Sequence, residues 1–123
     1  MLYQENIKKA AKRNEAFRRV ISTGKKSQLV LMAIAEGEDI GAEVHPATDQ
    51  ILFIFDGEGK AIVNGKTFKV GENDVVFVPA GARHNLVNEG DEPLKLFTVY
   101  SPPEHADGTV HATKEDALAA EHA

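Results

Sequence analysis

Four side chains that could hold a metal ion or move a proton lie in two short stretches of this chain. Glu43, His45 and Gln50 lie in and beside the stretch HPATDQ, and His84 follows the stretch PAGAR. Imidazole, carboxylate and amide oxygen form a mixed nitrogen and oxygen donor set, which suits Mn, Fe, Ni, Zn or Cu better than Ca or Mg. A single histidine near a strand is more often a hydrogen-bonded or surface residue, so the residue types alone leave both interpretations open.

The spacing of these residues predicts which of them share a face. Residues two apart in an extended segment point the same way, so Glu43, His45 and Ala47 are expected on one face. Gln50 has the opposite parity and reaches that face only if the intervening segment 46–48 forms a turn or a bulge, which Pro46 favours.

The middle of the chain predicts short strands separated by turns, as in a β-sandwich or barrel. Strands are expected at 28–35, 50–56, 74–78, 84–88 and 94–100, with a hairpin over 61–70. The hairpin centres on Asn64-Gly65, the pair that best tolerates the positive φ angles of a type I′ turn.

The two ends of the chain differ from this middle. Residues 5–19 are rich in Lys, Arg, Ala and Glu and predict a loose helix or an arm. Thr113 and Asp116 have the spacing of a capping box before a short helix. We therefore expect a single domain over 1–123, with a barrel core at about 26–100, an N-terminal arm over 1–25 and a C-terminal tail over 101–123.

The stretch NDVVFVPAGARHNLVN resembles the second sequence motif of the cupin family. That motif is a glycine, five residues, and then P-x-G-x-x-H-x-x-x-N, and here Pro79, Gly81, His84 and Asn88 are in register. Asn73 replaces the leading glycine and is another residue that accepts left-handed backbone conformations.

The stretch HPATDQILFIFDG resembles the first cupin motif, H-x-H, a short gap, Glu, six residues and Gly. His45 matches the first histidine, Gln50 stands in the glutamate position and Gly57 follows six residues later. Ala47 replaces the second histidine. The two motifs with their flanking strands extend the resemblance over most of the chain.

The resemblance implies an all-β fold, a double-stranded β-helix or jelly-roll barrel with its site in the barrel mouth. It further implies a divalent metal ion, Mn, Fe, Ni or Zn, on His45, Gln50 and His84, with the fourth position empty at Ala47. Glu43 could supply the missing donor, water could fill that position, or the barrel could be metal-free. The tail, SPPEHADGTVH, resembles small single-domain cupins without a firmly assigned reaction.

The resemblance leaves the function open, because one fold hosts many activities. The leading hypothesis is a metal-binding protein that acts on or senses a small organic molecule, by isomerase, dioxygenase or lyase chemistry if it is an enzyme. Glu43 is then the expected general base, as the ionisable group placed beside the ion. The alternatives are a non-catalytic barrel that binds a sugar or a small acid, and a structural scaffold. His105 and His111 are expected to be exposed loop histidines, unless the tail closes over the mouth.

Composition limits the partners. The formal net charge is −5, with Lys and Arg spread along the chain, which argues against nucleic-acid and membrane partners. The chain has no cysteine, no membrane-length apolar run and no signal-peptide pattern, so a cytoplasmic protein is expected. The strands LVLMAI and ILFIF are apolar on both faces, so the outer face needs cover. A homodimer is expected to provide that cover, and the alternative is that the N-terminal arm alone does so.

Overall fold

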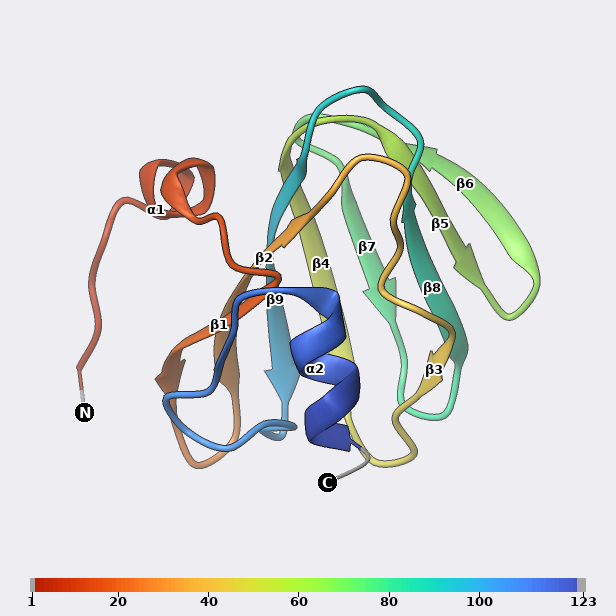
Figure 1. Ribbon diagram of the computed structural model, residues 1–123. Coiled ribbons are helices and arrows are strands. Elements are labelled where there is room, and N and C mark those ends of the chain that lie inside the picture. The colour runs from red at the N-terminus through yellow and green to blue at the C-terminus, as the bar shows by residue number, and fades with distance from the viewer. Residues whose placement is uncertain (1, 122–123) are drawn as a thin grey trace.

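The computed structural model of the chain describes residues 2–121, which form two antiparallel sheets, two helices and the loops between them (Figure 1). In chain order the elements are α1 (Ile7–Arg13), β1 (Arg18–Thr23), β2 (Gln28–Ile34), β3 (Glu43–Val44), β4 (Asp49–Asp56), β5 (Gly59–Val63), β6 (Lys66–Val70), β7 (Val75–Val78), β8 (Arg83–Asn88), β9 (Leu94–Ser101), β10 (Val110–His111) and α2 (Lys114–Glu121). No helix within these residues is long and apolar enough to cross a membrane.

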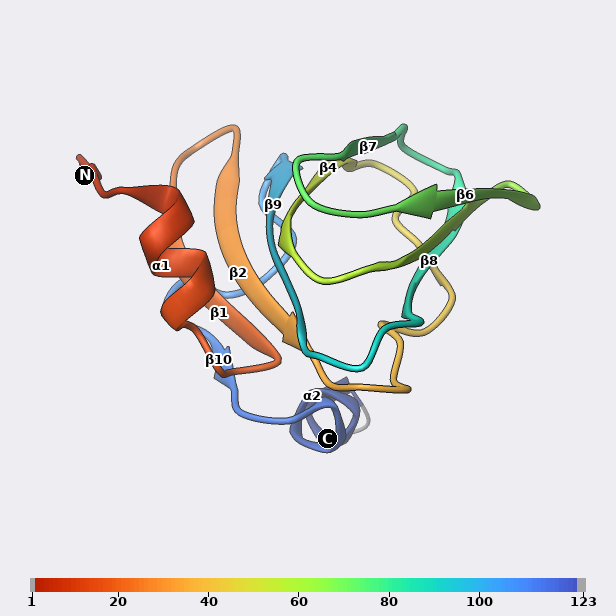
Figure 2. The same cartoon turned by 90° about the horizontal axis from the view of Figure 1, so that it is seen from above.

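The two sheets face each other as the layers of a jelly-roll sandwich (Figure 2). One sheet has the strand order β10-β1-β2-β9-β4-β7, and the other has the order β3-β8-β5-β6. The predicted jelly-roll architecture is therefore confirmed. The sheets also extend beyond 26–100, because β1 and β10 come from the segments expected as an arm and a tail.

Alternating side chains from the two sheets fill the space between the layers. Along β9 every second residue is buried, from Leu94 to Tyr100. The fully buried set includes Met32, Ile34, Leu52, Ile54, Leu86, Leu94 and Leu96. Each such side chain contributes about 1.5–3 kcal/mol through its removal from water, so this core holds the two sheets together.

The predicted hairpin turn is present between β5 and β6. Asn64 has a φ of 48° and Gly65 a φ of 81°, as a type I′ turn requires. Asn73, which replaces the leading glycine of the second motif, has a φ of 70°. The expectation that it accepts a left-handed conformation is therefore confirmed.

The N-terminal segment is shorter as a helix than residues 5–19 suggested. The Asn6 side chain accepts a hydrogen bond from the backbone of Lys9 at the start of α1, and Arg18 already belongs to β1. The helix packs Ala10 and Ala11 against Leu31 and other apolar residues on the outer face of the six-stranded sheet. The arm thus covers part of that face, while Val75 and Phe77 on β7 remain 61% and 57% exposed.

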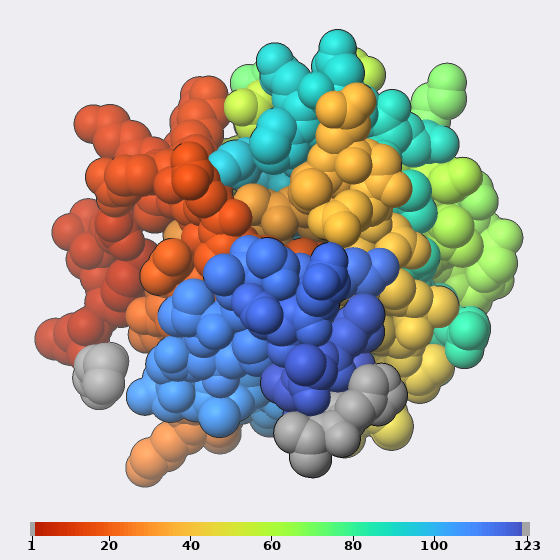
Figure 3. Space-filling view, in the orientation of Figure 1, coloured from red at the N-terminus to blue at the C-terminus, as the bar shows by residue number. Residues whose placement is uncertain are grey.

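The C-terminal segment lies across one face of the molecule, between the N-terminal strand and the segment that precedes β4 (Figure 3). The capping interaction predicted for α2 is present, since Asp116 donates its backbone N–H to Thr113 Oγ1. Lys114 forms an ion pair with Asp39. The hydrogen bonds from Asn85 and Lys114, together with the Lys114 charge, hold the pKa of Asp39 below its usual value.

Candidate functional site

The two motifs meet at one end of the barrel, where Glu43, His45 and His84 come together. Glu43 on β3 is the direct cross-strand partner of His84 on β8. The turn before β8 has Gly81 at a φ of 86°, a position that favours glycine, and its N–H donates to the carbonyl oxygen of His45. The imidazole rings of His45 and His84 consequently lie 5.3 Å apart, centroid to centroid.

Gln50 reaches the same interior layer from β4. A turn at Pro46 and Ala47 separates His45 from this strand, as the parity argument required. Gln50 is buried, and its side-chain Nε2 donates to Thr98 Oγ1 over 3.0 Å. This bond orients the amide and leaves Oε1 buried without a hydrogen-bond partner among the described residues.

Ala47 does not share the face of Glu43 and His45. The same turn that brings Gln50 inward exposes Ala47 to solvent. The expectation that all three residues point the same way was therefore wrong for Ala47, because two-residue periodicity ends where the strand ends.

His45 is held between two carboxylates. Its Nδ1 lies 2.8 Å from Glu104 Oε1, and its Nε2 lies 3.2 Å from Glu43 Oε2. The Glu43 carboxylate and, to a lesser degree, Glu104 raise the pKa of His45. Both contacts are ion pairs when the ring is protonated, and Nε2 is a buried nitrogen without a hydrogen-bond partner among the described residues.

The charge of Glu43 is favoured by its neighbours despite its partial burial. Burial by itself raises the pKa of this carboxyl group, but His45, Arg18 and His84 together bring the pKa below its ordinary value. Glu43 is therefore an ionised carboxylate at neutral pH, available as a ligand or as a base.

His84 presents a single ring nitrogen toward the site. Its Nδ1 lies 3.2 Å from the carbonyl oxygen of Ala82, an arrangement in which Nδ1 carries the proton and donates it. The other nitrogen, Nε2, then holds a free lone pair. Burial lowers the pKa of His84, which keeps the ring neutral.

Glu104 reaches His45 because Gln28 anchors the tail. The buried amide of Gln28 accepts from the N–H groups of Glu104 and His105 and donates to the carbonyl oxygen of His105. Glu104 was not named as a site residue in the sequence analysis, although it lies in the SPPEH stretch through which the tail resembles small single-domain cupins. The chain carries no local signal that a loop so far along will return to the barrel mouth.

The tail histidines lie inside this assembly rather than in open solvent. The His105 ring stands edge-on to Tyr100, with ring centroids 5.0 Å apart, and its Nε2 is buried. His111 Nδ1 lies 3.3 Å from a terminal nitrogen of Arg18, a buried residue on β1. The expectation of exposed loop histidines was therefore wrong, because the tail packs against the mouth.

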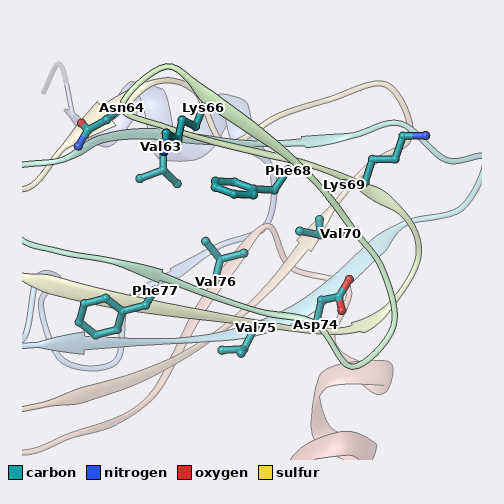
Figure 4. A pocket seen from close by; sticks show the side chains of 10 residues that line it. All are labelled: Val63, Asn64, Lys66, Phe68, Lys69, Val70, Asp74, Val75, Val76 and Phe77. Atoms are coloured by element: carbon teal, nitrogen blue, oxygen red, sulfur yellow. The ribbon is translucent and has the colours of Figure 1, made fainter.

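A separate groove of the surface lies between β6 and β7 (Figure 4). It has a volume of about 600 Å³, and Val63 and Phe68 point across it toward Val76. Its lining contains lysines and one aspartate but no histidine. This groove therefore lacks the donor set of the mouth and is separate from the candidate site.

The comparisons with known proteins agree with this architecture. A family described as the cupin domain matches residues 30–100, which span both motifs. The chain belongs to the cupin family. Its fold is also that of the Bacillus halodurans protein BH2720, with a TM-score of 0.95 and 42% identity over 97% of this chain and 95% of that one.

Two curated relatives differ in how much of their own length this chain covers. The uncharacterized Bacillus subtilis protein YrkC is 46% identical over 94% of this chain. Mannose-1-phosphate guanylyltransferase of Salmonella typhimurium is 30% identical over 66% of this chain. The chain spans 66% of the length of YrkC and 17% of the length of the transferase. The similarity thus covers about two thirds of the first relative and a small part of the second.

Cupins often bind divalent metal ions, so the donor geometry is decisive. Within residues 2–121, no three His, Asp or Glu side chains converge as a ready-made metal site. The donor chemistry nevertheless fits a metal. Gln50 Oε1 is a buried acceptor, and His45 Nε2 is a buried nitrogen that can ligate an ion once it gives up its proton; neither atom has a hydrogen-bond partner among the described residues.

Proposed function

We propose that the barrel mouth binds a divalent metal ion, Mn, Fe, Ni or Zn, on His45, Gln50, His84 and Glu43, and that the protein acts on or senses a small organic molecule there. The observation that carries this proposal is the orientation of the two histidine rings. Each has its Nδ1 against an oxygen, Glu104 for His45 and the Ala82 carbonyl for His84, so each offers Nε2 to the interior.

This arrangement is the one that metal-binding histidines usually have. A carboxylate or a carbonyl on the far nitrogen fixes the tautomer, orients the ring and raises the basicity of the ligating nitrogen. In this interpretation Glu104 is a positioning residue, since it acts on the ion only through His45.

Gln50 supports the proposal through its amide orientation. Its nitrogen is committed to Thr98, so the oxygen is the atom that remains for a ligand. An amide oxygen in place of a carboxylate brings no negative charge. The affinity of the site for a divalent ion then depends more on Glu43.

Glu43 takes the place of the missing second histidine in this proposal. Its carboxylate lies 3.2 Å from His45 Nε2, the atom that would face the ion. Binding therefore requires Glu43 to rotate away from that nitrogen so that both groups contact the ion. Because the turn exposes Ala47, no side chain at position 47 would compete with Glu43 for this role.

A bound ion would supply Lewis acidity or an activated water to a small substrate. The surrounding residues would hold the substrate and its protons in place. Tyr100 is fully buried, and burial raises the pKa of its hydroxyl well above the ordinary value, so it remains a proton donor at neutral pH. Isomerase, dioxygenase and lyase chemistry are all compatible with a metal ion beside a carboxylate and a tyrosine hydroxyl.

The metal content of the untagged protein tests the proposal. Elemental mass spectrometry should find about one ion per chain after incubation with Mn, Fe, Ni or Zn. His84→Ala should lose the ion because it removes one ligand, whereas His111→Ala should retain it as the matched control. Absence of stoichiometric metal from the wild-type protein under all four conditions would sink the proposal and favour a non-catalytic binding barrel.

Glu43→Gln separates the two roles of Glu43. The variant should bind the ion more weakly if the carboxylate is the fourth ligand. Full metal retention would instead assign Glu43 to proton transfer, the role first expected for it as a general base. The comparison uses the same metal titration for wild type and variant, so it requires no known substrate.

A further inference from the structure

Arg18 is a buried cation without a carboxylate partner. Its side chain projects from β1 into the barrel and is 3% exposed. The ion pairs formed within residues 2–121 do not include it. It lies against the ring of Phe17, with the guanidinium carbon 5.3 Å from the ring centroid, and against His111 Nδ1. The Tyr100 hydroxyl and the Glu43 carboxylate are near enough for the charge of Arg18 to lower their pKa values, but Glu43 forms no ion pair with it. A buried guanidinium is costly unless an anion compensates it.

Two buried polar atoms beside Tyr100 have no hydrogen-bond partner among the described residues. They are Arg18 Nε and His105 Nε2, and the other two such atoms of the described chain belong to His45 and Gln50. All four residues lie around Tyr100: its ring is 5.0 Å from His105 and 5.8 Å from His45, and Gln50 is its cross-strand partner. Arg18 lies close enough to influence the pKa of the Tyr100 hydroxyl. Buried polar atoms are usually paired, so their concentration here indicates a ligand.

We propose that Arg18 and His105 bind the carboxylate group of a small monocarboxylic acid whose other end reaches His45. This inference rests on the proposed function, because it assigns the substrate class of the same barrel mouth. Arg18 supplies the charge, and His105 Nε2–H supplies a second donor.

The chemistry of the site favours a carboxylate over other anions. A guanidinium offers a planar fork of N–H groups that matches the two oxygens of a carboxylate. Burial lowers the pKa of His105 to about 4, so its ring is neutral at pH 7 and can donate one proton. The carboxylates of Glu43 and Glu104 lie in the same mouth and would repel a doubly charged anion such as phosphate.

A small acid between Arg18 and His105 requires the loop that carries His105 to move. His105 lies on the loop between β9 and β10, whereas Arg18 lies on a strand. A shift of this loop therefore changes the space between the two side chains without disturbing the sheet. Gln28 holds the backbone of the loop at Glu104 and His105 and so sets its resting position.

Thermal-shift and calorimetric titrations of the EDTA-dialysed chain of residues 1–123 test the inference. The probes are acetate, pyruvate and benzoate at constant ionic strength, with inorganic phosphate as the contrasting anion. A ligand that binds the folded state raises the melting temperature in proportion to its concentration over its Kd. At least one carboxylate should give a saturable rise that phosphate does not give.

Arg18→Met and His105→Phe should each weaken carboxylate binding on the order of tenfold or more. Arg18→Met should also leave the melting temperature without ligand unchanged or higher, because it replaces an unpaired buried charge by an apolar side chain. If Arg18→Met does not fold, the carboxylate affinity of His105→Phe tests the inference on its own. This change is confined to a loop and keeps an aromatic ring beside Tyr100.

No carboxylate response in the wild-type protein would overturn the inference, as would equal responses to carboxylate and phosphate, or equal affinity in wild type and His105→Phe. These outcomes are separable from failure of the metal proposal. The titrations use metal-depleted protein, and His84→Ala should lose the metal but keep the carboxylate response. Arg18→Met should lose the carboxylate response but keep the metal.

Discussion

Glu104 Oε1 lies 2.8 Å from His45 Nδ1, which connects the C-terminal tail to the barrel mouth through the histidine that the first motif supplies. The contact leaves Nε2 as the ring nitrogen available to a ligand. It also makes the tail part of the site, because Gln28 holds the backbone that carries Glu104. The tail thereby influences how His45 is oriented.

Glu104→Gln should weaken metal binding about 10–100-fold, because outer carboxylates orient ligating histidines and raise their basicity. The measurement is competitive titration of the metal against a chelator. Glu36→Gln is the matched control, since it makes the same chemical change on an exposed turn. Equal affinities of Glu104→Gln and wild type would show that Glu104 has no role in ligation.

The strands and turns could be predicted because their signals are local. Short apolar runs bounded by turn residues indicate strands, and the Asn64-Gly65 pair indicates a hairpin, wherever they occur. Glu43 was expected in the barrel mouth from its two-residue spacing to His45, and His84 from the resemblance to the second cupin motif; the two are cross-strand partners. Ala47 was misplaced because Pro46 begins a turn, which ends the two-residue periodicity on which the prediction depended.

Arg18 and Glu104 could not be found in the same way. Each belongs to the site only through the return of a distant segment, β1 in the first case and the tail in the second. Arg18 precedes another arginine, and nothing in that pair indicates which of the two side chains points inward. The structure answers this through the register of β1, which buries Arg18 and exposes Arg19.

Gly59→Ala should destabilise the fold by about 1–3 kcal/mol or more through overpacking. A Cβ at Gly59 would lie 2.2 Å from the carbonyl oxygen of Val87, which is backbone of the neighbouring strand and cannot rotate away. Gly24→Ala is the control, because the nearest atom to its added Cβ is at an ordinary 3.4 Å. Urea unfolding measures both. Equal free energies of unfolding would mean that β8 shifts to accommodate the methyl group at little cost.

The homodimer expected from the sequence remains a prediction, and its interface should include β7. Val75 and Phe77 are exposed there, and their cross-strand neighbours Phe53 and Ile51 on β4 are also apolar. None of these four side chains is charged, so a second copy of the chain packed against them would meet no like-charge repulsion. Light scattering after size exclusion should give twice the chain mass of 13.4 kDa, and Phe77→Ser should shift it toward the monomer.

Leu118→Ser is the control for the dimer experiment, because Leu118 is similarly exposed at 42% but lies on α2 and not beside β7. It should leave the mass unchanged. A wild-type mass of one chain at every concentration would contradict the dimer and leave α1 as the cover of that face.

His105 should make the stability of the fold fall in mild acid. Burial lowers its pKa to about 4 in the folded chain, against about 6.5 when exposed, and the charge of Arg18 acts in the same direction. The other titratable groups that influence it are Glu43, His45 and His111. Between these two pKa values the unfolded chain binds more protons than the folded one, so the free energy of unfolding decreases as the pH falls.

The contribution of His105 is thus fully present above about pH 6.5 and is lost as the pH approaches 4. His105→Gln cannot be protonated, so it should lose less stability than wild type between pH 7.5 and 4.5. Urea unfolding at both pH values gives the comparison, and the difference between the two proteins isolates this histidine from the other groups that titrate in the same range. If both proteins lose the same stability on acidification, His105 is not buried as a neutral ring, and the tail does not pack on Tyr100 in solution as it does in this structure.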